Sequence, residues 1–336
     1  MQLPGHVQCA DEVPWAEIPS LRPIDGELRE VRNLMREALV ASPIAEELTP
    51  LYDYLFLRSG KMIRPGLVLL AGRSAGQTTP DHLTAAAVVE MIHTATLLHD
   101  DVIDHGQRRR GAPTVNSLCG NESAVLLGDF VLSCVFKKVT DFEPKMAKVM
   151  AQIAVRVCEG ELRQVIQKRN WQLDEATYID IITEKSAAFF SGCCRIGAML
   201  AGGTDDQVEA LSRYGLHAGI AFQITDDVLD IAGDEQQMGK GARNDFDTSK
   251  LTLAVIHLLA RLDEAERRKV CVLLESPNES KRELAGLLHR HGSLEYARQR
   301  AQAHVTKAVE ALEAVSPGPA REALIEIARF MGDRTI

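Results

Sequence analysis

The chain has 336 residues, of which 46% are hydrophobic and 25% are charged, and its formal net charge at pH 7 is −9. These values are ordinary for a globular protein that buries a large core, and the negative charge argues against a general nucleic-acid partner. The first residues lack the basic and apolar runs of a secretory signal, and no apolar run reaches the length of a membrane span. We therefore expect a protein without a signal peptide or membrane anchor.

The cysteines are not spaced as metal ligands. There are seven of them, and Cys193 and Cys194 are adjacent within a helical segment. This arrangement favours buried thiols over a disulfide framework, so a reducing cytoplasm is the simplest location. Trp171, Cys193 and Cys194 are expected to serve packing.

Helical periodicity dominates the chain after its first residues. Residues 1–24 contain four prolines and are expected to form a loose arm. Apolar residues at helical spacing then predict helices within the ranges 24–41, 48–57, 65–75, 81–104, 121–139, 144–170, 174–202, 205–233, 251–274, 278–291, 293–315 and 319–331. No segment shows the sustained alternation that predicts a strand. The sequence predicts one all-α domain over 25–336, with about ten or more helices.

Two segments carry three aspartates each, at offsets 0, 1 and 4: Asp100, Asp101 and Asp104 in the first, and Asp226, Asp227 and Asp230 in the second. Positions i and i+4 lie one above the other on a helix, so each segment points two acids along one edge. A single such motif is common on a solvated helix face. Two copies among apolar residues, such as Leu98 and Ile224, instead predict a paired site for Mg²⁺, which prefers oxygen ligands and completes its shell with phosphates.

Basic residues occur in two short segments that could hold anions. Lys61 and Arg64 lie at a loop-to-helix junction just before Pro65, where a helix N-terminus already favours an anion. The arginine triplet 108–110 follows the first acidic motif, and arginine binds phosphate oxygens bidentately. A solvated loop or internal ion pairing would also explain these residues. Together with Lys185, Lys240 and Lys250, however, they predict a site for two diphosphates bridged by metal.

Several ordered motifs resemble the trans-isoprenyl diphosphate synthase (polyprenyl synthetase) family over roughly 45–335. The segments that carry the resemblance are SGKMIRP, EMIHTATLLHDDVIDHGQRRRGAPTVN, LLGDFVLSC, CEGELRQ, TEKSAAFFSGCCRIGAMLAG and FQITDDVLDIAGDEQQMGKGARNDFDTSKLTL. The resemblance implies a single large helical bundle around a central cavity.

The resemblance also implies a role for each matching residue. The metal ligands would be Asp100, Asp101, Asp104, Asp226, Asp227 and Asp230. Isopentenyl diphosphate would be bound by Lys61, Arg64, His93 and Arg110. The allylic diphosphate would be bound by Arg109, Lys185, Lys240 and Lys250. Ser186 and Gln223 would face the developing carbocation.

In this family, Mg²⁺ assists expulsion of diphosphate from the allylic substrate; the resemblance implies about three ions, for which Mn²⁺ can substitute. Isopentenyl diphosphate then attacks the allylic cation and a proton is lost. No side chain is an evident general base, so released diphosphate is the expected acceptor. The chain departs from the family pattern at Met62, which replaces a basic residue, and at Ser186, which replaces threonine. Other departures are Ser59, Arg243, Asn244, Ser249 and Ala254.

The residues upstream of the first motif bear on product length. In this family they line the pocket into which the product grows, and Ala95 and Thr96 lie one turn, about 5.4 Å, below Asp100. Small residues there imply a pocket that continues, whereas Met91 and Ile92 on the next turn are intermediate in size. We expect a product of about C20 or longer. The alternative is that Ala95 and Thr96 face a neighbouring helix.

Two other functions compete with chain elongation. A class I terpene cyclase also uses aspartate-bound metal, but it would not need Lys61, Arg64 and Arg110 for a second diphosphate. A non-catalytic regulatory subunit of a heteromeric prenyl synthase would be expected to lack some of the six aspartates. The resemblance implies a homodimer with no stable membrane anchor, in brief peripheral contact with a membrane when the oily product leaves.

Overall fold

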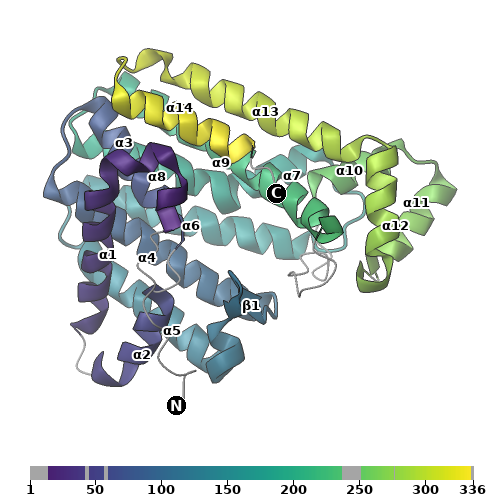
Figure 1. The fold of residues 1–336 in the computed structure, drawn as a ribbon, viewed down its shortest axis with the longest axis horizontal. Helices are drawn as coiled ribbons and strands as arrows, with labels where there is room; N and C mark the ends of the chain where they lie inside the picture. Colours follow the sequence, from purple (N-terminus) through teal and green to yellow (C-terminus); the bar gives the residue numbers. More distant parts are fainter. Residues whose placement is uncertain (1–13, 42–44, 57–59, 237–250, 276, 334–336) are drawn as a thin grey trace. The chain divides into compact units, whose positions relative to one another are not determined.

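The computed structural model describes residues 14–41, 45–56, 60–236, 251–275 and 277–333. These residues are almost entirely helical, which confirms the all-α prediction. The α-helices run over Asp25–Val40 (α1), Ala45–Phe56 (α2), Ile63–Ala75 (α3), Pro80–Ile103 (α4), Val115–Val139 (α5), Pro144–Ile166 (α6), Glu175–Ile182 (α7), Ala188–Leu200 (α8), Asp205–Gln236 (α9), Leu253–Arg261 (α10), Glu264–Glu275 (α11), Pro277–Arg290 (α12), Ser293–Ala311 (α13) and Pro319–Gly332 (α14). Figure 1 shows their order along the chain.

The chain forms two compact units that are interleaved in sequence. Unit 1 comprises residues 1–152, 192–211 and 314–324, and unit 2 comprises residues 153–191, 212–313 and 325–336. The first aspartate motif therefore belongs to unit 1 and the second to unit 2. The prediction of a single domain over 25–336 stays a prediction.

Helix α4 is the centre of unit 1. It packs against α1, α3 and α5, and its first half is an alanine- and valine-rich run in which residues 85–92 are all buried. Small side chains allow neighbouring helices to approach closely, so this run suits a helix with neighbours on several sides. Thr79 caps the helix together with His82, whose Nδ1 accepts from the Thr79 backbone. The first aspartate motif is thus held at the far end of a long, fixed helix.

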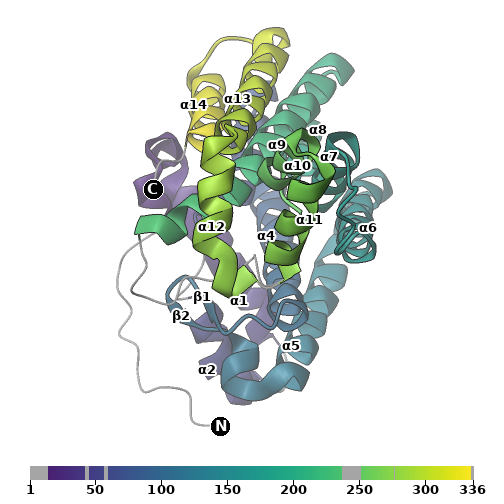
Figure 2. The same ribbon diagram turned by 90° about the vertical axis from the view of Figure 1, so that its right-hand side faces the viewer.

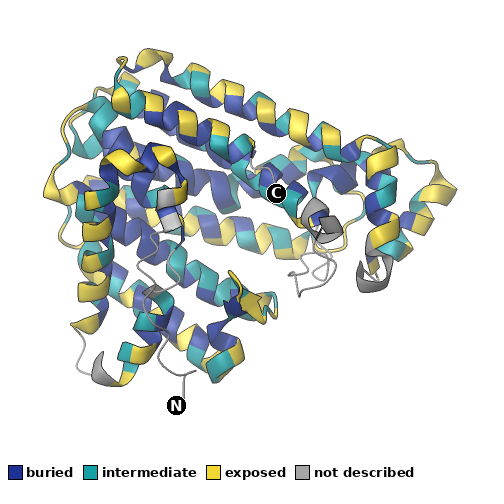
Figure 3. Ribbon diagram, viewed as in Figure 1, coloured by how far each residue is buried: buried dark blue, intermediate teal, exposed yellow. Residues whose placement is uncertain are grey.

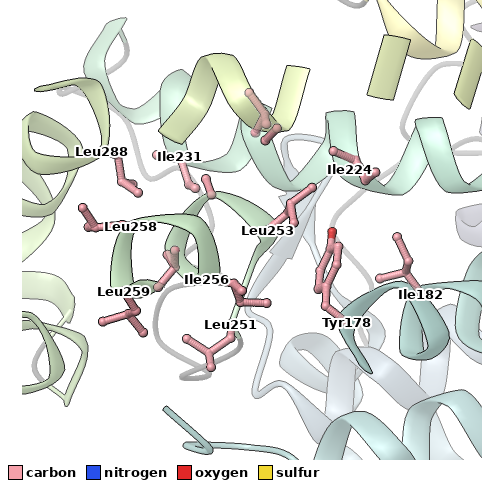
Figure 4. Packing of buried hydrophobic residues seen from close by; sticks show 14 of the residues in the cluster. Tyr178, Ile182, Ile224, Ile231, Leu251, Leu253, Ile256, Leu258, Leu259 and Leu288 are labelled. Atoms are coloured by element: carbon pink, nitrogen blue, oxygen red, sulfur yellow. The ribbon is translucent and has the colours of Figure 1, made fainter. Parts of the chain in front are cut away.

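Unit 2 has its own apolar core. Helices α10, α12 and α13 lie side by side (Figures 1 and 2) and pack on one another. Figure 4 shows Tyr178 of α7 and Ile224 of α9 beside the leucines of α10, and all of these residues are buried. Trp171 packs against the same cluster. Helices α1 and α13 bury one side and expose the other (Figure 3).

Four local features differ from the sequence expectations. Residues 14–24, expected to lie in a loose arm, form two 3₁₀ helices, Pro14–Glu17 (η1) and Pro19–Ile24 (η2), with Trp15 and Leu21 buried. Pro14 and Pro19 stand at the first positions of these helices, where proline is tolerated, so they did not exclude helical structure. A short hairpin pairs Arg108–Arg109 (β1) with Ala112–Pro113 (β2). Finally, the range 174–202 is interrupted by a π-helical turn, Thr183–Ala187 (η3), while a break after Arg261 divides the range 251–274.

None of the helices in the described part of the chain is both long enough and apolar enough to cross a bilayer.

Candidate active site

The first aspartate motif lies where α4 ends. Asp100 and Asp101 are in the last turn, and Asp104 is the C-cap residue. Asp101 is buried and accepts from Arg109, whose Nε lies 3.0 Å and whose Nη2 lies 2.9 Å from its Oδ1. Asp101 is therefore engaged by an arginine predicted to bind the allylic diphosphate. Asp100 and Asp104, both half-buried, are the pair that helical spacing places along one edge.

The hairpin after α4 places Arg110 against the loop that contains Gly60. Arg110 and Gly111 form its two-residue turn, with φ of 51° and 75°. This left-handed conformation suits glycine and is unfavourable for arginine, by about 1–2 kcal/mol. A Cβ on Gly60 would lie 2.5 Å from Nη2 of Arg110, so any larger residue here would require the guanidinium to shift. Lys61, the next residue, is exposed, and its Nζ lies 3.5 Å from Oε2 of Glu17.

Arg64, His93 and Arg110 influence one another electrostatically. Burial holds the pKa of His93 well below its usual range, and the nearby Arg64, Arg110 and Arg109 lower it further. Burial raises the pKa of Glu90, while Arg64 and Arg110 act in the opposite direction. Unit 1 thus brings together three of the four residues predicted to bind isopentenyl diphosphate, and it adds a buried carboxyl group, Glu90, that sequence analysis did not identify.

A narrow cavity of about 90 Å³ adjoins this group. Arg109, Arg110 and Asp101 line it together with apolar residues of α1, α4 and α5, including Met91 and Leu98. Of the residues predicted to line the product pocket, only Met91 borders this cavity. Ile92 and Ala95 are buried elsewhere on α4, and Thr96 is half-buried, with its Oγ1 donating to the His93 carbonyl at 2.9 Å. Their predicted role stays a prediction.

In unit 2 a chain of hydrogen bonds runs from the π-helical turn to the second aspartate motif. Ser186 Oγ donates to Gln223 Oε1 at 2.8 Å, and Gln223 Nε2 donates to Asp227 Oδ1 at 2.9 Å. Tyr178 Oη donates to the other oxygen, Asp227 Oδ2, at 2.6 Å. Burial, and then the charge of Asp227, raise the pKa of Tyr178 well above its usual range, so the phenol stays a donor. These hydrogen bonds hold the Asp227 carboxylate in place, and the carboxylate in turn orients the Gln223 amide.

Lys185 is held by α6. Its Nζ lies 2.6 Å from Oε1 of Glu161 and donates to Oε1 of Gln164 at 2.8 Å. Gly160 makes this proximity possible, because a Cβ at that position would lie 2.2 Å from the backbone nitrogen of Lys185. π-Helical turns are frequent at functional sites. Here the turn carries both Lys185 and Ser186, two residues assigned by the resemblance.

The sequence analysis assigned no role to Glu90, Tyr178 or Glu161. Glu90 and Glu161 lie within the quoted segments EMIHTATLL and CEGELRQ, so a charged residue in a motif was the available signal. Tyr178 gave none, since a tyrosine in an apolar helix is usually a core residue. Lys240 and Lys250 lie outside the described residues, as do the departures at 59, 243, 244 and 249. Met62 is fully buried, so the departure at this position places an apolar side chain inside the protein.

The aspartate oxygens in each unit suit a hard cation that also keeps water or substrate oxygens as ligands. Each motif offers oxygen ligands only, and one aspartate of each, Asp101 or Asp227, is already engaged by Arg109 or Tyr178. Across the described ranges no three His, Cys, Asp or Glu side chains form a ready metal cage. Mg²⁺, the ion predicted from the sequence, takes few protein ligands and completes its shell with water and substrate phosphates. The meeting of the two motifs around one metal cluster stays a prediction.

Comparison with known proteins identifies the family. Residues 45–290 match the family Polyprenyl synthetase. The chain is 36% identical over 284 residues to an octaprenyl diphosphate synthase of Haemophilus influenzae, covering 84% of this chain and 86% of that protein. It is also 36% identical over 295 residues to a short chain isoprenyl diphosphate synthase of Methanothermobacter thermautotrophicus, covering 86% of this chain and 91% of that protein.

A solved structure gives the same result. A polyprenyl synthase of Caulobacter crescentus, complexed with calcium and isoprenyl diphosphate, superimposes with a TM-score of 0.87 at 33% identity, covering 94% of this chain and 97% of that one. The family match and the structural similarity each cover most of the chain. The chain belongs to the Polyprenyl synthetase family and is a prenyltransferase of the polyprenyl diphosphate synthase type.

Proposed function

We propose that the chain condenses isopentenyl diphosphate with an allylic diphosphate by Mg²⁺-dependent, head-to-tail elongation in trans. The observation that carries this proposal is the presence within unit 1 of two sets of charged residues of different kinds. The Asp100–Asp104 motif with Arg109 forms one, and Arg64, His93 and Arg110 around Glu90 form the other. A carboxylate group suits a metal-bridged diphosphate, and a cationic group suits a second diphosphate bound directly. A terpene cyclase needs only the first.

The aspartates that would hold Mg²⁺ are Asp100 and Asp104 in unit 1 and Asp226 and Asp230 in unit 2, with Asp101 and Asp227 in support. When bound, the metal would stabilise the negative charge that develops on the departing diphosphate. Arg109 and Lys185 would bind that diphosphate through charge-assisted hydrogen bonds. To do so they must exchange their present carboxylate partners, Asp101 and Glu161, for phosphate oxygens.

The allylic cation would be stabilised by fixed dipoles rather than by water. Ser186 and Asp227 together hold the Gln223 amide in one orientation, so its carbonyl oxygen needs no rearrangement when charge develops nearby. Apolar side chains around the cation would exclude the water that would otherwise trap it. No group on the chain is assigned as general base. The released diphosphate would take the proton lost after condensation.

The proposed product is about C20 or longer. The support is the small side chain of Ala95 one turn below the first motif, where a bulky residue would close a pocket. The compared relatives carry names of both kinds, octaprenyl and short chain, so identity to them does not set the length.

The proposal is tested by supplying the purified chain with Mg²⁺, labelled isopentenyl diphosphate and allylic primers of several lengths, then sizing the products. We expect consumption of both substrates and products of about C20 or longer. Turnover of the allylic diphosphate in the absence of isopentenyl diphosphate would instead identify a cyclase. No turnover by the chain alone, with activity restored by a second synthase chain, would identify a regulatory subunit. EDTA should abolish the activity, and Mg²⁺ or Mn²⁺ should restore it.

We also propose that the chain works as a homodimer. Of the ten large hydrophobic residues exposed in the described part, seven lie on α5 and α6: Val125, Leu126, Phe136, Val155, Leu162, Val165 and Ile166. On α6, Val155, Leu162 and Ile166 are spaced by seven and four residues and therefore share one face. Exposed apolar residues of this kind mark interaction sites; those of α5 belong to unit 1 and those of α6 to unit 2, and a second copy of the chain offers the same residues in return. We propose in addition that the protein is located in the cytoplasm.

A further inference from the structure

The hairpin Arg108–Pro113 is joined to two other parts of unit 1. At its base, Thr114 Oγ1 donates to the Gly106 carbonyl at 2.7 Å, which joins the hairpin to the loop that follows α4. On its outer edge, Tyr54 Oη donates to the Pro113 carbonyl at 2.6 Å. Tyr54 belongs to α2, and the two residues are 59 positions apart in the sequence. The Tyr54 hydroxyl group therefore connects the hairpin to a helix that is distant along the chain.

The geometry of the hairpin explains why this carbonyl group is available. Arg109 and Ala112 form the pair that flanks the two-residue turn, and the Thr114 backbone nitrogen donates to the Gln107 carbonyl at 3.1 Å. Hydrogen-bonded pairs alternate with pairs whose backbone groups point away from the partner strand, so the Pro113 carbonyl points outward. Proline has no N–H group. The edge of the hairpin at Pro113 therefore presents an acceptor alone, which suits a phenol donor.

Helix α2 is a fixed support for this contact, because three consecutive residues each contact a different element. The ring of Tyr52 stacks on Phe130 of α5, with the ring centroids 6.1 Å apart and an interplanar angle of 12°. Asp53 Oδ1 lies 2.8 Å from Nη2 of Arg36 on α1, and Tyr54 contacts the hairpin. Tyr52 and Tyr54 are both buried. The phenol donor thus belongs to a helix that α1 and α5 already hold in place.

The hairpin carries two of the arginines predicted to bind diphosphates. Arg109 has an anchor on α4, because its Nη2 lies 2.9 Å from Oδ1 of Asp101. Arg110 is at the turn, where its guanidinium group lies against Gly60, and it borders the same narrow cavity as Tyr54. Its φ of 51° is unfavourable for a residue with a side chain, and such a conformation persists only where surrounding contacts hold it. The Tyr54 hydroxyl group supplies one of these contacts, through the strand that leaves the turn.

We propose that Tyr54 is a positioning residue for Arg110, acting through its hydrogen bond to the Pro113 carbonyl. The inference rests on the proposed function, in which Arg110 binds isopentenyl diphosphate. Without the hydroxyl group, the outer edge of the hairpin loses this contact with α2, and Arg110 occupies its binding position for a smaller fraction of the time. The affinity for isopentenyl diphosphate falls with that fraction. Arg109 keeps its ion pair with Asp101, so binding of the allylic diphosphate is affected less.

The test is calorimetric titration of the full chain in the presence of Mg²⁺, with isopentenyl diphosphate and geranyl diphosphate as separate probes. Tyr54→Phe removes the hydroxyl group and keeps the aromatic ring. It should weaken binding of isopentenyl diphosphate about threefold to tenfold, as expected for one hydrogen bond, and binding of geranyl diphosphate by at most about twofold. Tyr52→Phe is the matched control, because it removes a buried hydroxyl group that has no hydrogen-bond partner among the described residues. This control should bind both probes as the parent does.

Hydrogen exchange of the ligand-free chain tests the anchoring of the hairpin without any substrate. The Thr114 amide, which donates to Gln107, should exchange faster in Tyr54→Phe than in the parent or in Tyr52→Phe. Exchange in α4 should be the same in all three proteins, which confirms that each variant is folded.

The proposal is overturned if exchange over 107–114 is unchanged in Tyr54→Phe, if this variant binds isopentenyl diphosphate as tightly as the parent, or if binding of both probes weakens equally. It is also overturned if the parent does not bind isopentenyl diphosphate, a result that would contradict the proposed function as well. Neither measurement requires prenyl transfer. A parent protein that binds both probes but transfers no prenyl group would therefore contradict the proposed function alone.

Discussion

Glu90 is a buried carboxyl group beside the proposed isopentenyl diphosphate site, and its ionisation should make stability depend on pH. Burial raises its pKa above the ordinary 4.5, while Arg64 and Arg110 act against that shift. Between pH 4.5 and the raised pKa, the Glu90 carboxyl group is therefore protonated in the folded chain and ionised in the unfolded chain. The free energy of unfolding should then fall as the pH rises through the raised pKa.

Glu90→Gln should remove the loss of unfolding free energy that accompanies ionisation of Glu90. Relative to the parent, the stability of the variant should increase between about pH 4.5 and the raised pKa and become constant above it. Urea unfolding from pH 4 to 8 measures the difference. Because Glu90 also balances the charges of Arg64 and Arg110, we expect the KM for isopentenyl diphosphate to change by more than the KM for the allylic substrate. A pH-independent difference in stability would contradict the assignment.

His304 should make the protein less stable as the pH falls, which is the opposite of the effect of Glu90. Burial, and then neighbouring His217, lower its pKa from 6.5 to about 4; its Nδ1 lies 3.3 Å from Nδ1 of His217. The unfolded chain binds the proton first as pH falls, so stability that is complete above pH 6.5 should be lost progressively towards pH 4. His304→Gln should flatten this dependence, and His289→Gln, at an exposed position on α12, should leave it intact. Thermal unfolding across this range distinguishes the two.

Ala95 is the residue at which product length can be examined. It is fully buried, so Ala95→Phe must displace its neighbours, and if they line the growing product the chain length should shorten. Thr84→Phe makes a change of similar size at a half-buried position near the start of α4, sixteen residues before Asp100, and it serves as the control. We expect shorter products for Ala95→Phe only, determined by chromatographic sizing. Identical product distributions for the parent and Ala95→Phe would remove Ala95 from the pocket.

At the scale of helices and turns, a close approach between α6 and the π-helical turn positions Lys185. Gly160→Ala would place a methyl group 2.2 Å from the Lys185 backbone nitrogen, and backbone atoms cannot move aside cheaply. We expect a loss of about 1–3 kcal/mol in stability and a higher KM for the allylic diphosphate. Gly26→Ala in α1, where a Cβ meets nothing within 4 Å, should instead gain about 0.5 kcal/mol. Denaturant unfolding and initial rates test both, and an unchanged KM would separate Gly160 from the site.

The helices were predictable because long amphipathic segments repeat a strong signal. The Arg108–Pro113 hairpin was not, since two-residue strands are too short to show alternation. The candidate site likewise has a part that could be predicted from the sequence and a part that could not. Its charged residues could be assigned from ordered motifs, whereas the hydrogen bond of Tyr178 to Asp227 joins residues 49 positions apart and leaves no local pattern.

At the scale of the whole molecule, the exposed apolar residues of α5 and α6 predict self-association. Phe136 is 66% exposed and Ile166 is 76% exposed. Phe136→Glu or Ile166→Glu would place a charge in the proposed interface and should weaken the dimer at least about tenfold. Val272→Glu, at a residue 64% exposed on α11, is the matched control and should not. Light scattering during size-exclusion chromatography reads the mass against 36.9 kDa for one chain. A monomeric parent protein would refute the proposal.

The position of Cys158 on α6 offers a natural chemical reporter. It is exposed and lies one turn from Val155 and from Leu162, whereas Cys193 and Cys194 are buried and burial raises the pKa of both thiols. A maleimide should therefore label Cys158 readily in dilute solution and slowly once two chains cover α6. Peptide mapping of the labelled protein over a range of concentrations would follow assembly in the unaltered enzyme.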